Sequence, residues 1–229
     1  MKKINRYKVS LVLNIIIVLL TVLSTIFMFT GFKFMHGVEP VLESTKLGAF
    51  KYFTVDSNVF AGIISFIFIF INIGVLKGKR KNISKKLYLL KLMATSGVTL
   101  TFAVVFLYLG HIAQGGIYSL LLNSNLFFHL IIPILNIVDF VLFIQFDDVL
   151  YRYAFYGLIP MGLYSIFYAT NVILHINNGM VSPKYDWYWF VQNGIWTMIF
   201  VIPIIVSLNY IISLLLVLFN KKKKRFIEG

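Results

Sequence analysis

Six long apolar segments constrain this chain more than any other feature of its sequence. They span residues 9–29, 57–76, 87–110, 126–146, 152–174 and 195–219. The hydrocarbon core of a bilayer takes about 20 helical residues to cross, so each segment is long enough to span it. Only helices and closed barrels satisfy their backbone groups in lipid, and apolar runs such as Ile63–Ile73 lack the alternation of a barrel strand. The sequence therefore predicts an all-α, polytopic membrane bundle, with residues 1–229 as one domain.

The amino-acid composition excludes several other classes of protein. The chain is 59% hydrophobic and only 13% charged, whereas a soluble domain has about 25% charged residues. A soluble fold of this size could not bury so much apolar surface. Because cysteine is absent, the sequence also excludes a disulfide scaffold, a thiolate nucleophile and a zinc site with cysteine ligands.

The distribution of the 21 basic residues predicts the orientation in the membrane. Sixteen fall on one side of the six segments: Lys2, Lys3, Arg6, Lys8, Lys77, Lys79, Arg80, Lys81, Lys85, Lys86, Arg152 and all five of 221–225. The opposite side has four, Lys33, Lys46, Lys51 and Lys184, and the remaining one, Lys91, lies just inside the third segment. The positive-inside rule then places both termini in the cytoplasm, with the basic tail 221–225 at the anionic inner leaflet.

Two further features support this assignment. Trp187, Trp189 and Trp196 gather near the start of the sixth segment, as is typical of an aromatic belt at the outer interface. The high content of Lys, Ile and Asn indicates an AT-rich bacterial genome, so we expect a multi-pass protein of a bacterial plasma membrane. We expect no nucleic-acid partner, and the oligomeric state is open.

Common catalytic and ligand-binding motifs are missing from the sequence. It has no G-x-S-x-G elbow, no H-E-x-x-H zinc helix, no phosphate-binding G-x-x-x-x-G-K-[ST] loop and no G-x-G-x-x-G. No spacing of histidines such as H-x-x-x-H supports a metal site. We therefore expect neither a metal nor a cofactor.

The fourth segment has a polar stripe on an otherwise apolar helix. At 100° per residue, Asn125, His129, Asn136 and Asp139 fall within an arc of about 80°. Such a stripe must face the bundle interior or a wet cavity, where ionisable groups are functional candidates. The alternative is a seam of hydrogen bonds between helices, which we favour for Asp139.

The fifth segment has a matching stripe of Tyr164, Tyr168, Asn171 and His175, within about 60°. We expect this stripe to face inward near the outer leaflet, either as packing or as part of a binding site. On the predicted topology all four histidines of the chain, His36, His111, His129 and His175, fall in the outer half.

The segment before the second apolar run admits two interpretations. Thr54, Asp56, Ser57 and Asn58 are all residues that cap the first turn of a helix. Alternatively, Thr54 is a nucleophile, because it lies at the same membrane level as His129, the usual type of base for activating a hydroxyl. Amides of the first turn could then stabilise an oxyanion.

These residues resemble motifs of a known family. The stretch Phe50-Lys-Tyr-Phe-Thr54, followed by a carboxylate, is similar to the threonine motif of the androgen-induced protein and ADTRP family. Asn125, His129 and Pro133 are similar to its histidine motif, and Phe53-Thr-Val-Asp-Ser-Asn58 is similar to bacterial members. The resemblance implies a six-helix intramembrane hydrolase of lipid esters, such as fatty acid esters of hydroxy fatty acids, with Thr54 as nucleophile and His129 as base.

We therefore expect a membrane hydrolase that cleaves an ester or related acyl bond of a lipid-like substrate. Asp56, Ser57, Asn58, Asn125, Asn136, Tyr164, Tyr168, Asn171 and His175 are the expected supporting or substrate-binding residues. Two alternatives use the same polar stripes: a small-solute transporter or proton-coupled binder, and a non-catalytic membrane partner of another protein.

Overall fold

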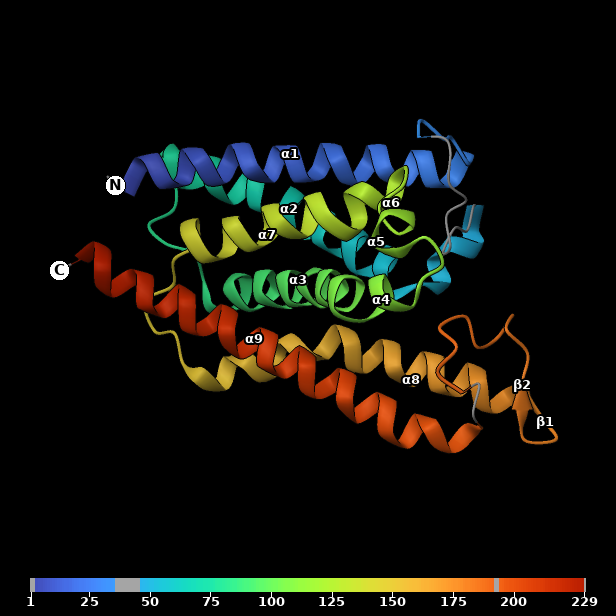
Figure 1. Cartoon of the computed structure of the whole chain (residues 1–229). Coiled ribbons are helices and arrows are strands. Elements are labelled where there is room, and N and C mark those ends of the chain that lie inside the picture. Colours follow the sequence, from blue (N-terminus) through green and yellow to red (C-terminus); the bar gives the residue numbers. More distant parts are fainter. Residues whose placement is uncertain (1–2, 36–45, 192–193, 229) are drawn as a thin grey trace.

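The computed structural model describes residues 3–35, 46–191 and 194–228. In this part of the chain the fold is all-α, and six helices are long and apolar enough to cross a membrane (Figure 1). These candidate spans are Ile4–Thr30, Phe53–Leu76, Lys85–Ile112, Ser124–Phe143, Tyr151–Leu174 and Met198–Lys222. The six predicted segments are thus confirmed, with boundaries that differ by a few residues.

Three of the spans are single regular helices and three are composite. α1 (Lys3–Thr30) and α2 (Phe53–Leu76) are uninterrupted, and α9 (Met198–Glu228) follows a short 3-10 turn, η6 (Ile195–Thr197). The third span runs from α3 (Lys85–Val104) through a π-helical turn, η2 (Val105–Leu109), to α4 (Gly110–Ile112). The fifth begins as a 3-10 helix, η5 (Tyr151–Leu158), and continues as α8 (Ile159–Leu174).

The fourth span is the most irregular. It comprises α6 (Ser124–Leu126), a π-helical turn η3 (Phe127–Ile131), α7 (Ile132–Val138) and a second π-helical turn η4 (Asp139–Phe143). π-Helical turns are rare and occur frequently at functional sites. Short elements complete the fold: η1 (Lys46–Lys51), α5 (Gly116–Ser119) and a hairpin of β1 (Ile176–Asn177) and β2 (Met180–Val181).

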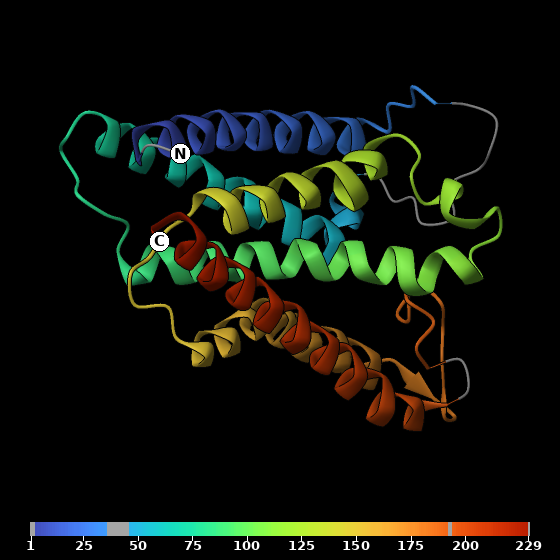
Figure 2. The same cartoon turned by 60° about the vertical axis from the view of Figure 1, so that its left-hand side comes forward.

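α3 lies at the centre of the bundle, between α1, α2 and α7 on one side and α8 and α9 on the other (Figures 1 and 2). Small residues let its neighbours approach closely, as is usual where membrane helices pack. Gly97 of α3 faces the side chains of Ser57 and Phe53, and Gly157 of η5 faces Ser213 of α9. α3 therefore contacts helices on both sides of the bundle.

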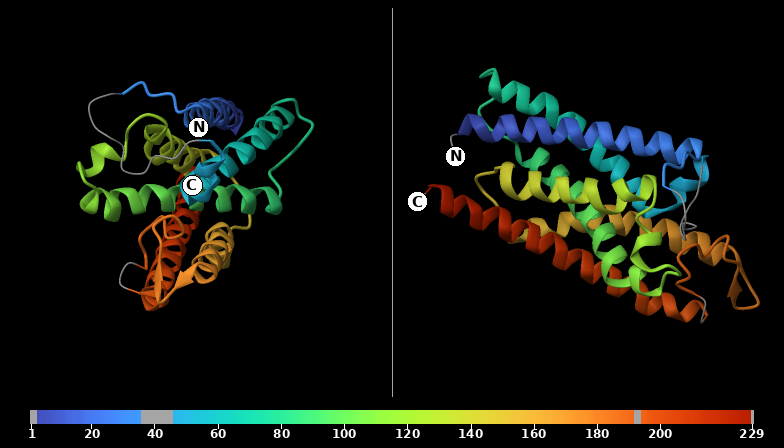
Figure 3. Two further views of the ribbon diagram at one scale, coloured as in Figure 1. Left: turned by 90° about the vertical axis from the view of Figure 1, so that its right-hand side faces the viewer. Right: turned by 45° about the horizontal axis from the view of Figure 1, so that its top comes forward.

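The N- and C-terminal ends lie at the same end of the bundle, as six crossings require (Figures 1 and 3). The loop that joins α2 to α3 and carries the basic cluster lies at that end too (Figure 1). The β-hairpin and the loop that follows it lie at the opposite end. Which end faces the cytoplasm stays a prediction from the basic residues.

Candidate active site

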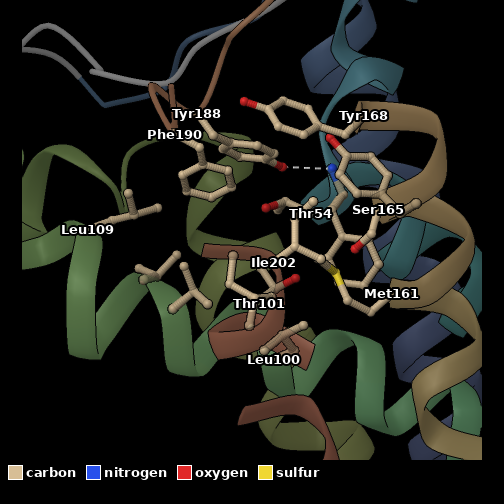
Figure 4. Close-up of a pocket in the computed structure, with 15 residues that line it drawn as sticks. Thr54, Leu100, Thr101, Leu109, Met161, Ser165, Tyr168, Tyr188, Phe190 and Ile202 are labelled. Atoms are coloured by element: carbon tan, nitrogen blue, oxygen red, sulfur yellow. Dashed lines mark hydrogen bonds between the residues drawn. The ribbon is translucent and has the colours of Figure 1, made fainter. Parts of the chain in front are cut away.

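Two pockets meet at Thr54, near the bundle end that carries the β-hairpin. The larger one, here called the apolar pocket, has about 670 Å³ of empty space and is walled mainly by aliphatic and aromatic side chains (Figure 4). The smaller one, here called the histidine pocket, has about 470 Å³ and contains His129. Three residues line both pockets: Thr54, Leu109 and Tyr188. Thr54 therefore has the apolar pocket on one side and the base proposed for it on the other.

Thr54 does not cap α2. The helix begins at Phe53, and its N-cap is the extended residue Tyr52, whose own side chain makes no capping hydrogen bond. The capping interpretation of Thr54 is therefore wrong. The Thr54 hydroxyl makes no hydrogen bond to any described residue, and the same holds for the Thr54 backbone N–H. A half-buried hydroxyl without a partner is available for chemistry in the pocket.

Ser57 and Asn58 hold the backbone of Thr54 from the next turn of α2. The Ser57 hydroxyl donates to the Thr54 carbonyl at 3.1 Å and lies 3.2 Å from the Thr101 hydroxyl of α3. The buried Asn58 amide donates to the Thr54 carbonyl at 2.8 Å and to the Phe128 carbonyl at 3.0 Å. Asn58 thus connects the turn that carries Thr54 directly to the π-helical turn that carries His129.

His129 is buried, and one hydrogen bond fixes its tautomer. Its Nδ1 lies 2.6 Å from the carbonyl oxygen of Leu120. Because a carbonyl can only accept, Nδ1 must carry the proton, which leaves Nε2 as an unprotonated acceptor in the neutral ring. A general base requires this state. No hydrogen bond joins Thr54 to His129, and such contacts are often loose before substrate binds.

Aromatic side chains from α8 and from the loop after β2 form one wall of the apolar pocket. The Tyr164 hydroxyl donates to the Lys51 carbonyl at 2.5 Å and accepts from the Trp187 indole at 3.0 Å. The Tyr168 hydroxyl donates to the Asp186 carboxylate. The predicted inward face of the fifth span is therefore confirmed for Tyr164 and Tyr168, both of which line the pocket.

Asp186 is buried and organises the loop at this wall. Its carboxylate accepts hydrogen bonds from the backbone N–H groups of Phe190 at 2.9 Å and Val191 at 3.0 Å. The loop is also tied to α8 by Asn171, whose amide donates to the Tyr185 carbonyl at 2.8 Å. Asn171 thus supports the site from outside the pocket.

Two other predicted residues lie near the site without joining Thr54 and His129 directly. Asn125 lines the histidine pocket. Asp56 lines a separate groove of about 1040 Å³ between α2, α3 and α8, together with Ser57 and Phe60. We call it the lateral groove. Phe53 and Tyr164 line both the lateral groove and the apolar pocket, so these two side chains form the partition between them.

The histidines do not gather into one site. His175 is exposed just after α8, where it stacks on Tyr185, so the expectation that it faces inward is wrong. His111 is also exposed, and His36 lies outside the described residues. Among the described residues, no group of three or more histidines, aspartates and glutamates could hold a metal ion.

Asn136 and Asp139 belong to a second polar site, which lies toward the termini. The Lys91 ammonium and the Asp139 carboxylate form an ion pair at 3.0 Å, and both side chains are fully buried. Lys91 also donates to Asn14 at 2.8 Å, Ser65 at 3.1 Å and Asn136 at 3.4 Å. The carboxylate accepts from Ser10 at 2.7 Å and from Asn14 at 2.8 Å. The seam interpretation of Asp139 is thus confirmed in its contacts, with the addition of a buried cation.

Sequence reasoning placed Lys91 inside the third segment but gave no role to it, to Asp186 or to Tyr188. The role of Lys91 could have been predicted, because a lysine more than one turn inside an apolar helix requires a partner. Asp139, inside the fourth segment, is an acidic residue that could pair with it. Asp186 and Tyr188 lie in a loop, where no helical or strand period shows which side chains face inward.

Comparison with known proteins adds no assignment to this geometry: no protein-family model, no curated protein and no solved structure matches this chain. The resemblance to the androgen-induced protein and ADTRP family rests on the motifs around Thr54 and His129 alone. Membership of that family and its chemistry are therefore proposals.

Proposed function

We propose that this chain is an intramembrane threonine hydrolase of the androgen-induced protein and ADTRP type, which cleaves an ester of a lipid-like substrate in a bacterial plasma membrane. One observation carries the proposal. The unpartnered hydroxyl of Thr54 lies where the apolar pocket meets a pocket containing His129, whose Nδ1 is held by the Leu120 carbonyl.

The reaction uses the two side chains in sequence. His129 Nε2 takes the hydroxyl proton as Thr54 Oγ1 attacks the ester carbonyl carbon, and the carbonyl electron pair moves onto its oxygen. When this intermediate collapses, the bond to the alkoxy oxygen breaks and His129 returns the proton to the leaving alcohol. Water then attacks the acyl-threonine by the same route, releasing the carboxylic acid and restoring the Thr54 hydroxyl. The net reaction consumes one ester and one water, and needs no cofactor.

The shape and chemistry of the pocket favour a fatty acyl chain. The lining of the apolar pocket is predominantly aliphatic and aromatic, as is usual for ligand pockets. Leu100, Met161, Ile202 and Ile205 supply the aliphatic part of its wall. A fatty acid ester would leave its acyl chain among these groups and its carbonyl near Thr54.

A fluorophosphonate probe tests the nucleophile directly. Purified protein treated with the probe should carry an adduct on Thr54, located by mass spectrometry, and the adduct should be lost in His129→Ala. Thr54→Ser should retain part of the hydrolysis of a lipid ester, because it keeps a hydroxyl, whereas the nearly isosteric Thr54→Val should not. Thr54→Ala, His129→Ala and the double variant should share nearly the same residual rate, since groups that act as a unit are non-additive. Full hydrolysis by Thr54→Val would refute the proposal.

A second candidate function is proton-coupled transport, which the buried pair of Lys91 and Asp139 favours. Ionisable groups inside membrane helices are typical of substrate pathways and proton relays. Protein reconstituted in liposomes would then acidify or alkalinise the lumen when solute is added, and Asp139→Asn would abolish this flux. Absence of solute-dependent proton movement, together with labelling of Thr54, would favour the hydrolase.

A further inference from the structure

Tyr188 occupies the same junction as Thr54. It belongs to the loop between β2 and η6, and with Thr54 and Leu109 it lines both the apolar pocket and the histidine pocket. In Figure 4 the side chains of Tyr188 and Thr54 point into the same part of the cavity. A substrate carbonyl brought to the Thr54 hydroxyl would therefore meet the phenol of Tyr188.

The loop holds Tyr188 in place at a conformational cost. The next residue, Trp189, has φ of 59°, in the left-handed region that bulky side chains rarely adopt. Strain of this kind persists only where the surroundings fix it, and it concentrates at functional sites. Here the Asp186 carboxylate fixes the backbone on the far side of Trp189, at Phe190 and Val191. The turn leaves Trp189 exposed and Tyr188 facing the pockets.

Two polar groups meet the Tyr188 hydroxyl: the Phe53 backbone N–H and the Tyr164 hydroxyl, with which it shares a side-chain hydrogen bond. The Phe53 backbone N–H, the first of α2, donates to the Tyr188 hydroxyl oxygen at 2.8 Å (dashed line in Figure 4). The oxygen thus acts as an acceptor toward the positive end of the helix, which polarises its O–H bond and strengthens it as a donor. Burial, together with the charge and hydrogen bond of Tyr164, raises the pKa of Tyr188 well above its usual value. The hydroxyl therefore keeps its proton at neutral pH and can turn it from Tyr164 to a ligand.

We infer, on the basis of the proposed hydrolase, that Tyr188 is a further catalytic residue whose hydroxyl donates a hydrogen bond to the ester carbonyl oxygen as Thr54 attacks. The negative charge of the intermediate forms on that oxygen while the proton stays on Tyr188, so no proton is consumed. The Thr54 backbone N–H, which has no acceptor among the described residues, is available as a second donor. On collapse the carbonyl re-forms and the hydrogen bond weakens.

Tyr188→Phe removes this donor and keeps the ring. Loss of one oxyanion donor typically lowers kcat by about 10²–10³-fold, and we expect a loss of that size with KM changed less than about threefold. Labelling of Thr54 by the fluorophosphonate should slow comparably, because the phosphoryl oxygen would take the place of the carbonyl oxygen. Tyr185→Phe is the matched control: it deletes a hydroxyl three residues away on the same loop, outside all three pockets, and should leave both rates unchanged.

A second variant separates catalysis from support of the helix end. Site-specific fluorotyrosine at position 188 keeps the oxygen that accepts from Phe53 but lowers the pKa of the phenol. Since the donor must be protonated, loss of activity at alkaline pH should begin at lower pH than in the natural protein. The other ionisable side chains around this hydroxyl, which the substitution leaves in place, are Tyr52, Tyr164, Tyr168 and His129.

Each outcome decides one question. A rate in Tyr188→Phe within threefold of the natural protein, or an unshifted alkaline limb in the fluorotyrosine protein, would overturn the role of Tyr188 alone, provided that Thr54 is labelled. If the natural protein is not labelled on Thr54 and does not hydrolyse lipid esters, the proposed function fails, and this inference fails with it.

Discussion

Removing one member of the buried ion pair should destabilise the bundle strongly. Lys91→Met keeps the length and volume of the side chain but takes away the positive charge and the donors that serve Asn14, Ser65 and Asn136. Asp139 then keeps its hydrogen bonds from Ser10 and Asn14 but has no cation within the buried site. A buried charge without a counter-charge is among the few changes that cost several kcal/mol.

The separation of the two charges sets the scale of the effect. At 3.0 Å and an effective dielectric constant of 20, the attraction is about 5 kcal/mol, most of which offsets the cost of burying the two charges. Loss of one partner from such a pair costs about 3–5 kcal/mol. For a chain of this size each kcal/mol lowers Tm by about 2–4 °C, so we expect Lys91→Met to lower it by about 6–20 °C.

The double variant Lys91→Met/Asp139→Leu provides the decisive comparison. It removes both charges together, so no uncompensated ion remains, and replacing a buried pair by apolar groups of similar volume is often neutral. Unfolding in detergent micelles should therefore give a coupling free energy of at least about 2 kcal/mol in a double-mutant cycle. The control Lys86→Met, at an exposed position of the same helix, should change stability by less than about 0.5 kcal/mol. A single variant Lys91→Met as stable as the control would refute the reasoning.

Three further predictions concern topology, packing and the site. The variant Ser182→Cys, which has no other cysteine, should react with an impermeant thiol reagent from outside intact cells. Labelling solely from the cytoplasmic side would show that the predicted orientation is wrong. Gly157→Ala should lower stability by about 1–3 kcal/mol, because the added Cβ would lie 2.1 Å from the Ser213 hydroxyl. The control Gly162→Ala meets no atom within 4 Å and should be neutral, so equal melting temperatures of the two variants would contradict the packing. Asn58→Ala should lower kcat for lipid-ester hydrolysis at least tenfold without a comparable change in KM, because it removes the hydrogen bonds that link the turn of Thr54 to the turn of His129. An unchanged kcat would rule out this positioning role of Asn58.

The helices could be predicted because the bilayer imposes a length and a composition on each of them. The inward faces could be predicted for residues that lie within the helices. Tyr164 and Tyr168 lie on one uninterrupted helix, α8, so their 100° spacing holds and both line the apolar pocket. His175 follows the last residue of that helix, so the same arithmetic does not apply to it.

The fourth span shows that residues on one inward face can belong to different sites. The predicted arc of Asn125, His129, Asn136 and Asp139 assumed 3.6 residues per turn, but two π-helical turns wind more loosely. All four side chains are at least partly buried, as predicted, yet they serve two different sites. His129 lines the histidine pocket, whereas Asn136 and Asp139 join the ion pair. No residue type in the sequence signals a π-helical turn in advance.

The two polar sites can be separated experimentally because α3 holds them apart. Lys91 and Thr101, which lines the apolar pocket, are ten residues apart on this helix, a rise of about 15 Å. At that distance the Lys91 ammonium could not contact an ester carbonyl at Thr54, so we expect the ion pair to take no part in the proposed hydrolysis.

The double variant Lys91→Met/Asp139→Leu should therefore retain labelling of Thr54 at a rate within about threefold of the natural protein, while any proton-coupled transport would be abolished with the charges. Labelling that falls with the ion pair, in protein that still elutes as a single folded species, would mean that the two ends of α3 are coupled. In that case the hydrolase and transport proposals could no longer be treated as alternatives, because one set of charges would serve both.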